Sequence, residues 1–435
     1  MKSIPTRLSV LNFLEFAVWG AYLTSMGNFL WRASLAEDIF WFYAVQGLAS
    51  LFMPALIGYL ADSIIAPRKM LSICHFLSAT MKSLALYYCI SSPVIKFWPL
   101  FILFGLGVSF YIPTIGLNNA YVMGCLKKNG FDPVKMFPKV RVFGTIGFIT
   151  AMLMVNFIPF EGVSLQASPW QLGLSACFSM VLAIYILFLP KSEKPSGDKS
   201  DTRGSYCTLL KDKNIFCFLI FTFLISICLQ ITNSYCNPYI SSFATIPEFA
   251  GSWGARNANA IISLSQLSEA LFVLLVPLAM KWFDIKKILI IAATAWTLRF
   301  GFLAIGNTNA GIIALIVSMI VYGIAFDFVN ITGAIYLDSC VDKSLKNRVQ
   351  SLFMLVMSGM GATIGTPIAG WVVNSLVYSR HNPELQQSGW QQSWFIFAAY
   401  SFIIALLIYF VYPSISRTNR DTEKQKRVAK FGTYK

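Results

Sequence analysis

The chain contains, from Ser318 to Leu337, the segment SMIVYGIAFDFVNITGAIYL. This segment is apolar and long enough to cross a bilayer as a helix, which takes about 20 residues. It carries one acid, Asp327, near its middle. An ionised Asp at the centre of a spanning helix costs about 2.5–3.5 kcal/mol, so Asp327 needs a partner, a water-filled cavity or a proton.

The composition extends this interpretation to the whole chain. Of its 435 residues, 56% are hydrophobic and only 12% are charged, whereas a soluble domain has about 25% charged residues. We therefore expect a polytopic membrane protein. The nine cysteines show no C-x-x-C pair and no metal-ligand spacing. Most fall in apolar segments, so we interpret them as small buried residues and expect no disulfide framework.

Twelve segments are apolar and long enough to span a bilayer. The basic stretch 1–7 precedes an apolar run that is too long for a signal peptide, so the first of them is expected to be a permanent helix. The predicted spans are 8–30, 39–61, 70–91, 97–121, 138–158, 171–189, 215–241, 259–280, 288–306, 310–336, 349–377 and 391–412.

Lysine and arginine are distributed unevenly between the two sides of these spans. The segments on the N-terminal side hold 27 of the 34 Lys and Arg residues and the opposite loops hold 4, with Lys139 counted in the loop before its span. Cytoplasmic loops carry the positive excess, so both termini are predicted to be cytoplasmic. The net charge of +15 then follows from topology and gives no indication of nucleic-acid binding.

The longest charged linker divides the spans six and six. We expect an N-terminal six-helix bundle over 1–190, a cytoplasmic linker over 191–214, a C-terminal six-helix bundle over 215–413 and a basic cytoplasmic tail over 414–435. Two six-helix halves with a site between them near the midplane are the layout of the major facilitator fold. The predicted fold class is an all-α integral membrane protein with twelve transmembrane helices.

The loop after the second span resembles the loop motif of the facilitator superfamily. It contains Gly58, Asp62, Arg68 and Lys69, in a somewhat stretched version of that motif. The resemblance implies a gate in which these residues hold the cytoplasmic side closed. The alternative is an ordinary positively charged cytoplasmic loop.

Two spans place polar residues on one helix face. In 138–158, Arg141, Thr145 and Phe148 follow i, i+4 and i+7, which suits a flat, polar ligand. Alternatively, Arg141 is only the last cation of the preceding loop. In 215–241, amide side chains that offer both donors and acceptors lie at i, i+3 and i+7; alternatively they bond neighbouring helices to each other. These amides are Gln230, Asn233 and Asn237.

The two acids of the later spans, Glu269 and Asp327, are candidates to carry a proton. Desolvation favours the neutral form of a buried carboxyl group, which can then load and release a proton. The alternative is a structural ion pair with Arg141 or Arg299. The acids share their helices with further polar or aromatic residues at helical spacing, namely Gln266, Tyr322, Phe326 and Asn330.

Several stretches, in the same order and at similar spacing over nearly the whole chain, resemble the nucleoside:proton symporter family. These are the bacterial nucleoside permeases of the major facilitator superfamily. Only the linker 191–213 and the two tails fall outside the resemblance. The matching stretches are FMPAL at 52–56, RVFGTIGF at 141–148, LQITN at 229–233, SLSQLSE at 263–269 and VYGIAFDFVN at 321–330.

The resemblance implies a set of substrate-binding residues, each of the residue type expected in the family. Glu15, in the first span, departs from the family, whose members carry Gln there. We expect Glu15 either to add a third proton site beside Glu269 and Asp327 or to pair with Lys82. The implied substrate-binding residues are Arg141, Thr145, Phe148, Gln230, Asn233, Gln266, Glu269, Tyr322, Phe326 and Asp327.

Together these observations predict proton-coupled import of nucleosides across a bacterial inner membrane by alternating access. We expect a multi-pass monomer in lipid, with the proton as coupling ion and with no other cofactor, metal or catalytic residue. An oligosaccharide:proton symporter or a drug exporter of the same fold is the alternative. A membrane enzyme or sensor is disfavoured, because we find no nucleophile motif, histidine cluster, metal-ligand spacing or sensory domain.

Overall fold

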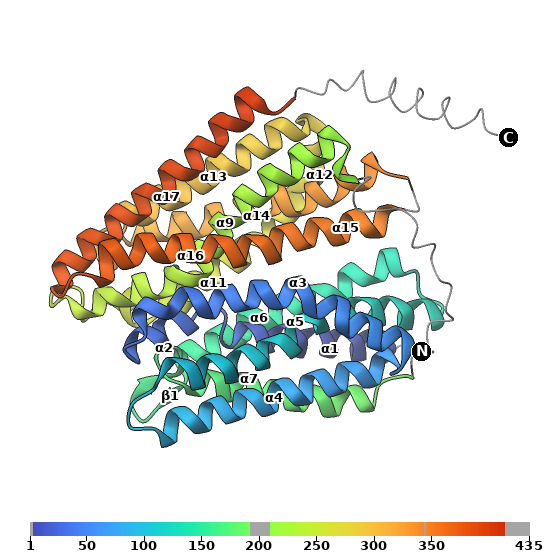
Figure 1. Cartoon of the computed structure of the whole chain (residues 1–435), viewed down its shortest axis with the longest axis horizontal. Helices are drawn as coiled ribbons and strands as arrows, with labels where there is room; N and C mark the ends of the chain where they lie inside the picture. Colours follow the sequence, from blue (N-terminus) through green and yellow to red (C-terminus); the bar gives the residue numbers. More distant parts are fainter. Residues whose placement is uncertain (1–2, 192–208, 343–344, 414–435) are drawn as a thin grey trace.

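The computed structural model describes residues 3–191, 209–342 and 345–413 and is almost entirely helical (Figure 1). Within these residues the strands are β1 (Pro159–Phe160) and β2 (Val163–Ser164), which form one short antiparallel pair. Most of the predicted linker and the whole predicted tail, 414–435, lie outside the described residues.

Eleven helical segments in the described part of the chain are long and apolar enough to cross a membrane. The N-terminal helices are α1 (Ser3–Gly20), α2 (Met26–Arg32), α3 (Ile39–Ser63), α4 (Pro67–Ser91), α5 (Phe97–Lys128), α6 (Pro133–Phe157) and α7 (Trp170–Leu187). The C-terminal helices are α9 (Lys213–Ser242), α10 (Trp253–Arg256), α11 (Ala258–Phe272), α12 (Val276–Trp282), α13 (Ile285–Ile305), α14 (Ile312–Cys340), α15 (Lys346–Met354), α16 (Gly361–Val373) and α17 (Pro383–Val411).

Two predicted spans consist of more than one helix but run without a break. A 3₁₀ turn at Val273–Leu275 joins α11 to α12, so that the two form one span over Ala258–Trp282. A π-helical stretch at Leu355–Met360 joins α15 to α16 in the same way. Such irregular turns are tolerated in a membrane where neighbouring helices cover the backbone.

The first predicted span, 8–30, differs from the prediction because it is interrupted between α1 and α2. The backbone mixes two patterns here: the amides of Tyr22 and Ser25 donate to carbonyls three residues back (3.2 Å each), whereas that of Leu23 still donates to a carbonyl four residues back (3.0 Å). Gly20 ends α1 against α6, where an added Cβ would lie 2.3 Å from the Phe148 carbonyl oxygen. The end of α1 therefore coincides with a close helix crossing, which hydropathy does not report.

The helices form two groups that lie side by side (Figure 1). In the N-terminal group α1 packs on α6, and α4 packs on α5 and α7. In the C-terminal group α13 packs on α14 and α17, and α11 packs on α14. The groups meet where α3 contacts α16, α6 contacts α11 and α2 contacts α9. The residues on α6, α9, α11 and α14 that the sequence singled out therefore lie on helices at or next to this interface.

The hydrogen bonds that join the two groups lie at one end of the molecule. Asn28 of α2 donates to Ser241 near the end of α9 (3.0 Å). Asn156 near the end of α6 donates to Asn257 just before α11 (2.7 Å). The other residues bonded across this end are Thr24, Glu37, Phe40, Gln166, Asn237, Arg256, Asn259, Ala260, Thr366 and Asn374. We call this end the closed end.

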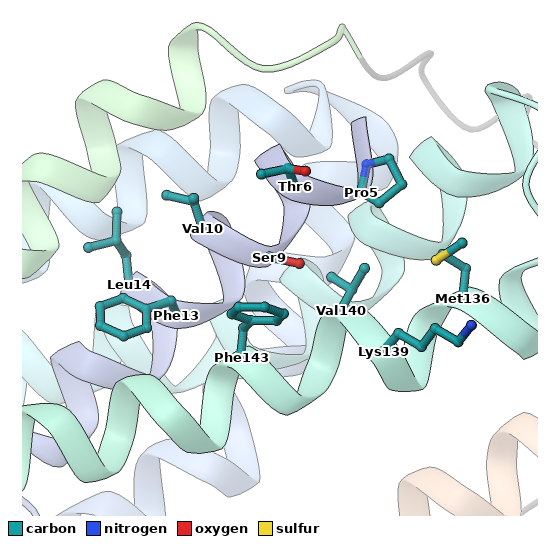
Figure 2. A pocket seen from close by; sticks show the side chains of 10 residues that line it. All are labelled: Pro5, Thr6, Ser9, Val10, Phe13, Leu14, Met136, Lys139, Val140 and Phe143. Atoms are coloured by element: carbon teal, nitrogen blue, oxygen red, sulfur yellow. The ribbon is translucent and has the colours of Figure 1, made fainter. Parts of the chain in front are cut away.

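A groove of about 520 Å³ lies between α1 and α6, towards the end opposite the closed end (Figure 2). Its walls are mainly apolar, and none of them belongs to a residue that the resemblance assigns to substrate. We therefore do not place the substrate there. The lining residues are Pro5, Thr6, Ser9, Val10, Phe13, Leu14, Met136, Lys139, Val140 and Phe143.

The predicted gating motif lies at the same end as this groove. Arg68, near the start of α4, donates to the carbonyl oxygens of Leu187 (3.0 Å) and Leu189 (2.7 Å), so it satisfies the last turn of α7. An added Cβ at Gly58 would meet nothing within 4 Å. Lys69 is exposed, and the side chain of Asp62 lies outside the described residues. The described contacts hold α4 to α7 within one group, and the gating role stays a prediction.

Candidate functional site

The predicted substrate residues come from four helices that surround the interface between the groups. α6 carries Arg141, Thr145 and Phe148, and α9 carries Gln230 and Asn233. Most of the ten predicted residues are half-buried, as expected for side chains that border a water-accessible opening. The remaining residues are Gln266 and Glu269 on α11, and Tyr322, Phe326 and Asp327 on α14.

Three of these residues line one small cavity. Asn233, Gln266 and Tyr322 form its walls together with the buried guanidinium of Arg299 from α13. Thr24, from the interruption between α1 and α2, reaches the same cavity from the other group of helices. The other lining residues are Thr232, Ile262 and Ser265. The cavity therefore lies where α9, α11, α13 and α14 meet, and Thr24 of the N-terminal group completes its wall.

Aromatic rings flank this point on α14. The rings of Tyr322 and Phe326 are nearly parallel, with centroids 5.7 Å apart and planes at 8°. Trp296 of α13 meets Tyr322 edge-on at 5.9 Å, which fixes the plane of the tyrosine ring. Phe148 is more deeply placed: it is 6% exposed and packs edge-on against Trp19 at 6.0 Å. Phe326 is therefore better placed than Phe148 to contact a ligand.

The two acids form no direct ion pair with a cation among the described residues. Asp327 is 1% exposed, and its Oδ2 has no hydrogen-bond partner in the part of the chain that the structure describes. Glu269 interacts electrostatically with Arg141 across the interface and with Asp327 on the neighbouring helix. The alternative, a structural ion pair of either acid with Arg141 or Arg299, is thus not found among the described residues.

Arg141 lies within α6 and is half-buried, so it is not a loop cation. Its guanidinium lies 3.9 Å from the ring centroid of Phe16 on α1. Stacking on an aromatic face orients the planar fork of an arginine and leaves its N–H groups available at the edge. This geometry favours the interpretation of Arg141 as a residue of the interface.

The amides of α9 divide into two kinds. Asn237 is fully buried and donates to Asn259 (2.7 Å) and Gln166 (3.3 Å), so it bonds helices to each other at the closed end. Gln230 and Asn233 are half-buried, and no described residue forms a hydrogen bond with their side chains. The interhelical alternative therefore holds for Asn237, while Gln230 and Asn233 keep free donors and acceptors.

Of the two roles expected for Glu15, a third proton site or a pair with Lys82, the pair with Lys82 is not found. Its Oε2 lies 2.9 Å from His75 Nε2 and its Oε1 accepts from Thr114 (2.7 Å). Lys82 instead donates to Ser175 (3.0 Å). The sequence placed Glu15 and Lys82 in separate spans but did not show which turn of α4 faces α1. That packing favours His75, which is one of only two histidines in the chain.

Sequence reasoning did not include Arg299, Thr24, Thr232 or Ser265 among the substrate residues. A charge inside a span, such as Arg299, indicates a functional residue. No other polar residue lies at helical spacing from Arg299 on its own helix, so the sequence did not connect it to the substrate. Single hydroxyls in a span carry no such signal, because they commonly bond to their own helix backbone.

The chain was compared with known proteins by family, sequence and structure. The family model described as "Nucleoside H+ symporter" matches residues 1–416. The xanthosine permease of Escherichia coli (strain K12) is 34% identical, with 98% of this chain and 99% of the permease covered. The nucleoside permease NupG of the same organism is 35% identical, with 93% of this chain and 94% of the permease covered.

A solved structure agrees with these matches. The crystal structure of the nucleoside transporter NupG superposes with a TM-score of 0.81 and 33% identity, covering 95% of this chain and 100% of that chain. A peptide transporter of the POT family shares the fold at a TM-score of 0.67, but with 13% identity it indicates the fold alone. The match of the family model over nearly the whole chain, together with relatives above 30% identity, shows that this chain belongs to the nucleoside H⁺ symporter family.

Proposed function

We propose that this protein imports nucleosides together with protons across a bacterial inner membrane. The observation that carries the proposal is the meeting of two acids, free amides and stacked aromatic rings at the interface between the two helix groups. Family membership gives nucleosides as the substrate class and protons as the coupling ion. The amides and aromatic rings can bind the nucleoside, and the two acids can bind the proton.

A nucleoside presents a flat base, hydroxyl groups and a base edge with donors and acceptors. The face of Phe326, in register with Tyr322, is placed to stack on the base. Such stacking contributes about 1–3 kcal/mol per base in nucleic-acid-binding proteins. Gln230, Asn233 and Gln266 offer amides to the hydroxyls and the base edge. We assign Arg141, Thr145 and Phe148 to the N-terminal wall of the same site.

The proton is carried, in this proposal, by Glu269 or Asp327. Asp327 has an unpartnered buried oxygen, and an ionised carboxylate in that position is costly. Protonation removes this cost and leaves a neutral hydrogen-bond donor beside the substrate. One proton moving down 100 mV contributes about 2.3 kcal/mol, which is about 50-fold in accumulation. Loading is favoured by protonation outside and release by deprotonation inside.

We propose that the two helix groups rock about this site, so that it opens alternately to the two sides of the membrane. The hydrogen bonds described between the two groups lie at the closed end. With both termini cytoplasmic, as the Lys and Arg distribution predicts, the closed end faces away from the cytoplasm and the site opens inward. We further propose that the protein acts as a monomer in lipid, without nucleic acid and without a cofactor other than the proton.

Uptake into energised membrane vesicles tests this function. We expect labelled uridine and adenosine to accumulate, a protonophore to abolish the accumulation, and lactose to remain excluded. Accumulation of lactose in place of nucleosides would favour an oligosaccharide symporter. Uridine accumulation that persists with the protonophore would contradict proton coupling.

A further inference from the structure

Arg299 is a completely buried cation that nothing in the proposed function uses. It lies on α13 with 0% exposure. Its Nη1 donates to the Ser318 carbonyl (2.8 Å) and to Ser265 Oγ (3.2 Å), and its Nε donates to Thr232 Oγ1 (3.5 Å). Its Nη2 has no hydrogen-bond partner among the described residues. One edge of a charged fork is therefore unsatisfied inside the protein.

This arrangement is unusual because all the partners of Arg299 are neutral. A guanidinium carries five N–H donors and stays charged in proteins. No acid forms an ion pair with Arg299 in the described part of the chain. The ring of Tyr322, 4.7 Å from the guanidinium carbon, offers partial compensation. An unsatisfied buried charge calls for an acceptor, and one with negative character most of all.

The cavity that Arg299 lines has the size of a single polar atom. Its volume is about 10 Å³, roughly the room for one water molecule. Asn233, Gln266 and Tyr322, three residues assigned to the substrate, form its other walls. A ribose or a base does not fit in this space, but one exocyclic oxygen of a bound nucleoside does.

We propose that Arg299 is a specificity-determining residue that donates, through Nη2, to one exocyclic oxygen of the substrate. This inference rests on the proposed function. The oxygen is either a keto oxygen of the base or a hydroxyl of the ribose; both are acceptors that enter a pocket of this size. An amino group in the same position would be rejected, because a guanidinium has no acceptor to offer it. Nucleosides that place oxygen there are thus selected over those that place nitrogen there.

The test measures equilibrium binding to the purified full chain with a set of uridine analogues, each lacking one oxygen. The probes are uridine, 2′-deoxyuridine, 3′-deoxyuridine and the analogues without the 2-oxygen or the 4-oxygen of the base. The wild-type protein should bind one analogue about tenfold or more weaker than uridine, as expected for a lost hydrogen bond to a charged group. Because the amides of the site also bond to the hydroxyls and the base edge, the analogue whose deficit disappears in Arg299→Met is the one that tells base from ribose.

In Arg299→Met, uridine should bind about tenfold or more weaker, and the discriminated analogue should bind as well as uridine does. Arg299→Lys, which keeps the charge but loses the fork, should also lose the discrimination. Thr297→Val is the matched control: it removes from the same helix a hydroxyl that bonds to Ala293 and Ser401 and that does not line the cavity, so the ranking of the analogues should persist.

Two results would overturn the proposal. If Arg299→Met and Arg299→Lys keep the wild-type ranking of analogues, the guanidinium touches no substrate oxygen and a water fills the cavity instead. If the wild-type protein binds every analogue as tightly as uridine, no substrate oxygen accepts a hydrogen bond from a buried charged donor. Absence of nucleoside binding in the wild-type protein would instead refute the proposed function itself, so the two failures are distinguishable.

Discussion

Both helix groups bury ionisable side chains, but the two groups differ in how many of these side chains have partners. In the N-terminal group Glu15, His75 and Lys82 all have 0% exposure, and each has described partners. Glu15 pairs with His75 at 2.9 Å, and the Lys82 ammonium lies 4.6 Å from the ring centroid of Tyr22. In the C-terminal group, one oxygen of Asp327 and one nitrogen of Arg299 lack partners among the described residues.

This difference separates the charges that stabilise the fold from those that can bind substrate or a proton. A buried charge with its full set of partners favours one arrangement, and removing a partner costs several kcal/mol. A buried charge that lacks a hydrogen-bond partner raises the free energy of the protein until a proton or a ligand satisfies it. We therefore interpret the Glu15–His75 pair as structural, and Asp327, Glu269, Arg141 and Arg299 as the groups that substrate and proton engage.

The largest effect is expected from Asp327→Asn. The amide cannot cycle a proton, so accumulation of uridine against its gradient should disappear, while exchange of uridine at equilibrium persists. Counterflow and energised uptake in the same vesicles measure both. Glu269→Gln is the parallel variant, and the one that keeps counterflow without accumulation marks the coupling acid. Normal accumulation in Asp327→Asn would show that Asp327 does not carry the proton.

Next in size is the loss of stability in Glu15→Leu. The substitution leaves His75 and Thr114 without their partner in the bundle, which should cost about 3–5 kcal/mol. Thermal unfolding of the purified protein should show a lower midpoint. Glu269→Leu is the control, since Glu269 is half-buried and has no described ion pair; its midpoint should change little. Equal shifts in the two variants would remove the distinction between the groups.

The aromatic residues provide a smaller contrast. Phe326→Ala should weaken uridine binding by about 1–3 kcal/mol and leave the folded yield near that of the wild-type protein. Phe148→Ala should lower the folded yield as well, because its ring is buried against Trp19 next to the α1–α6 crossing. Binding measured on folded protein, together with size-exclusion yield, separates the two effects. A larger loss of yield in Phe326→Ala than in Phe148→Ala would contradict this assignment.

The smallest effect concerns Arg141, the cation of the N-terminal group that lies at the interface. Arg141→Lys keeps the charge and loses the planar fork, so we expect correct insertion and about tenfold lower uptake, equivalent to about 1.4 kcal/mol. Uptake corrected for the amount of inserted protein is the measurement. Uptake and uridine affinity near those of the wild-type protein would return Arg141 to the role of a topological charge.

Hydropathy predicted eleven spans well because membrane length and apolar content are local properties of the sequence. The break between α1 and α2 coincides with the close crossing of α1 and α6 at Gly20, which is a tertiary property. Helical spacing identified the faces of α6, α9, α11 and α14 that carry polar residues. It did not reveal that Glu15 would meet His75, or that Arg299 would line the same cavity as Asn233 and Gln266. Those relations depend on which helices become neighbours.

The most direct test of the central claim is the proton movement that accompanies substrate. Uridine is added to proteoliposomes without a membrane potential, and the external pH is recorded for the wild-type protein, Glu15→Gln and Asp327→Asn, with Glu269→Gln in parallel. We predict that uridine drives proton uptake in the wild-type protein and in Glu15→Gln, and that uptake disappears when the coupling acid of the C-terminal group is neutralised. Loss of proton uptake in Glu15→Gln, with uridine binding intact, would contradict the division between paired and unpaired charges.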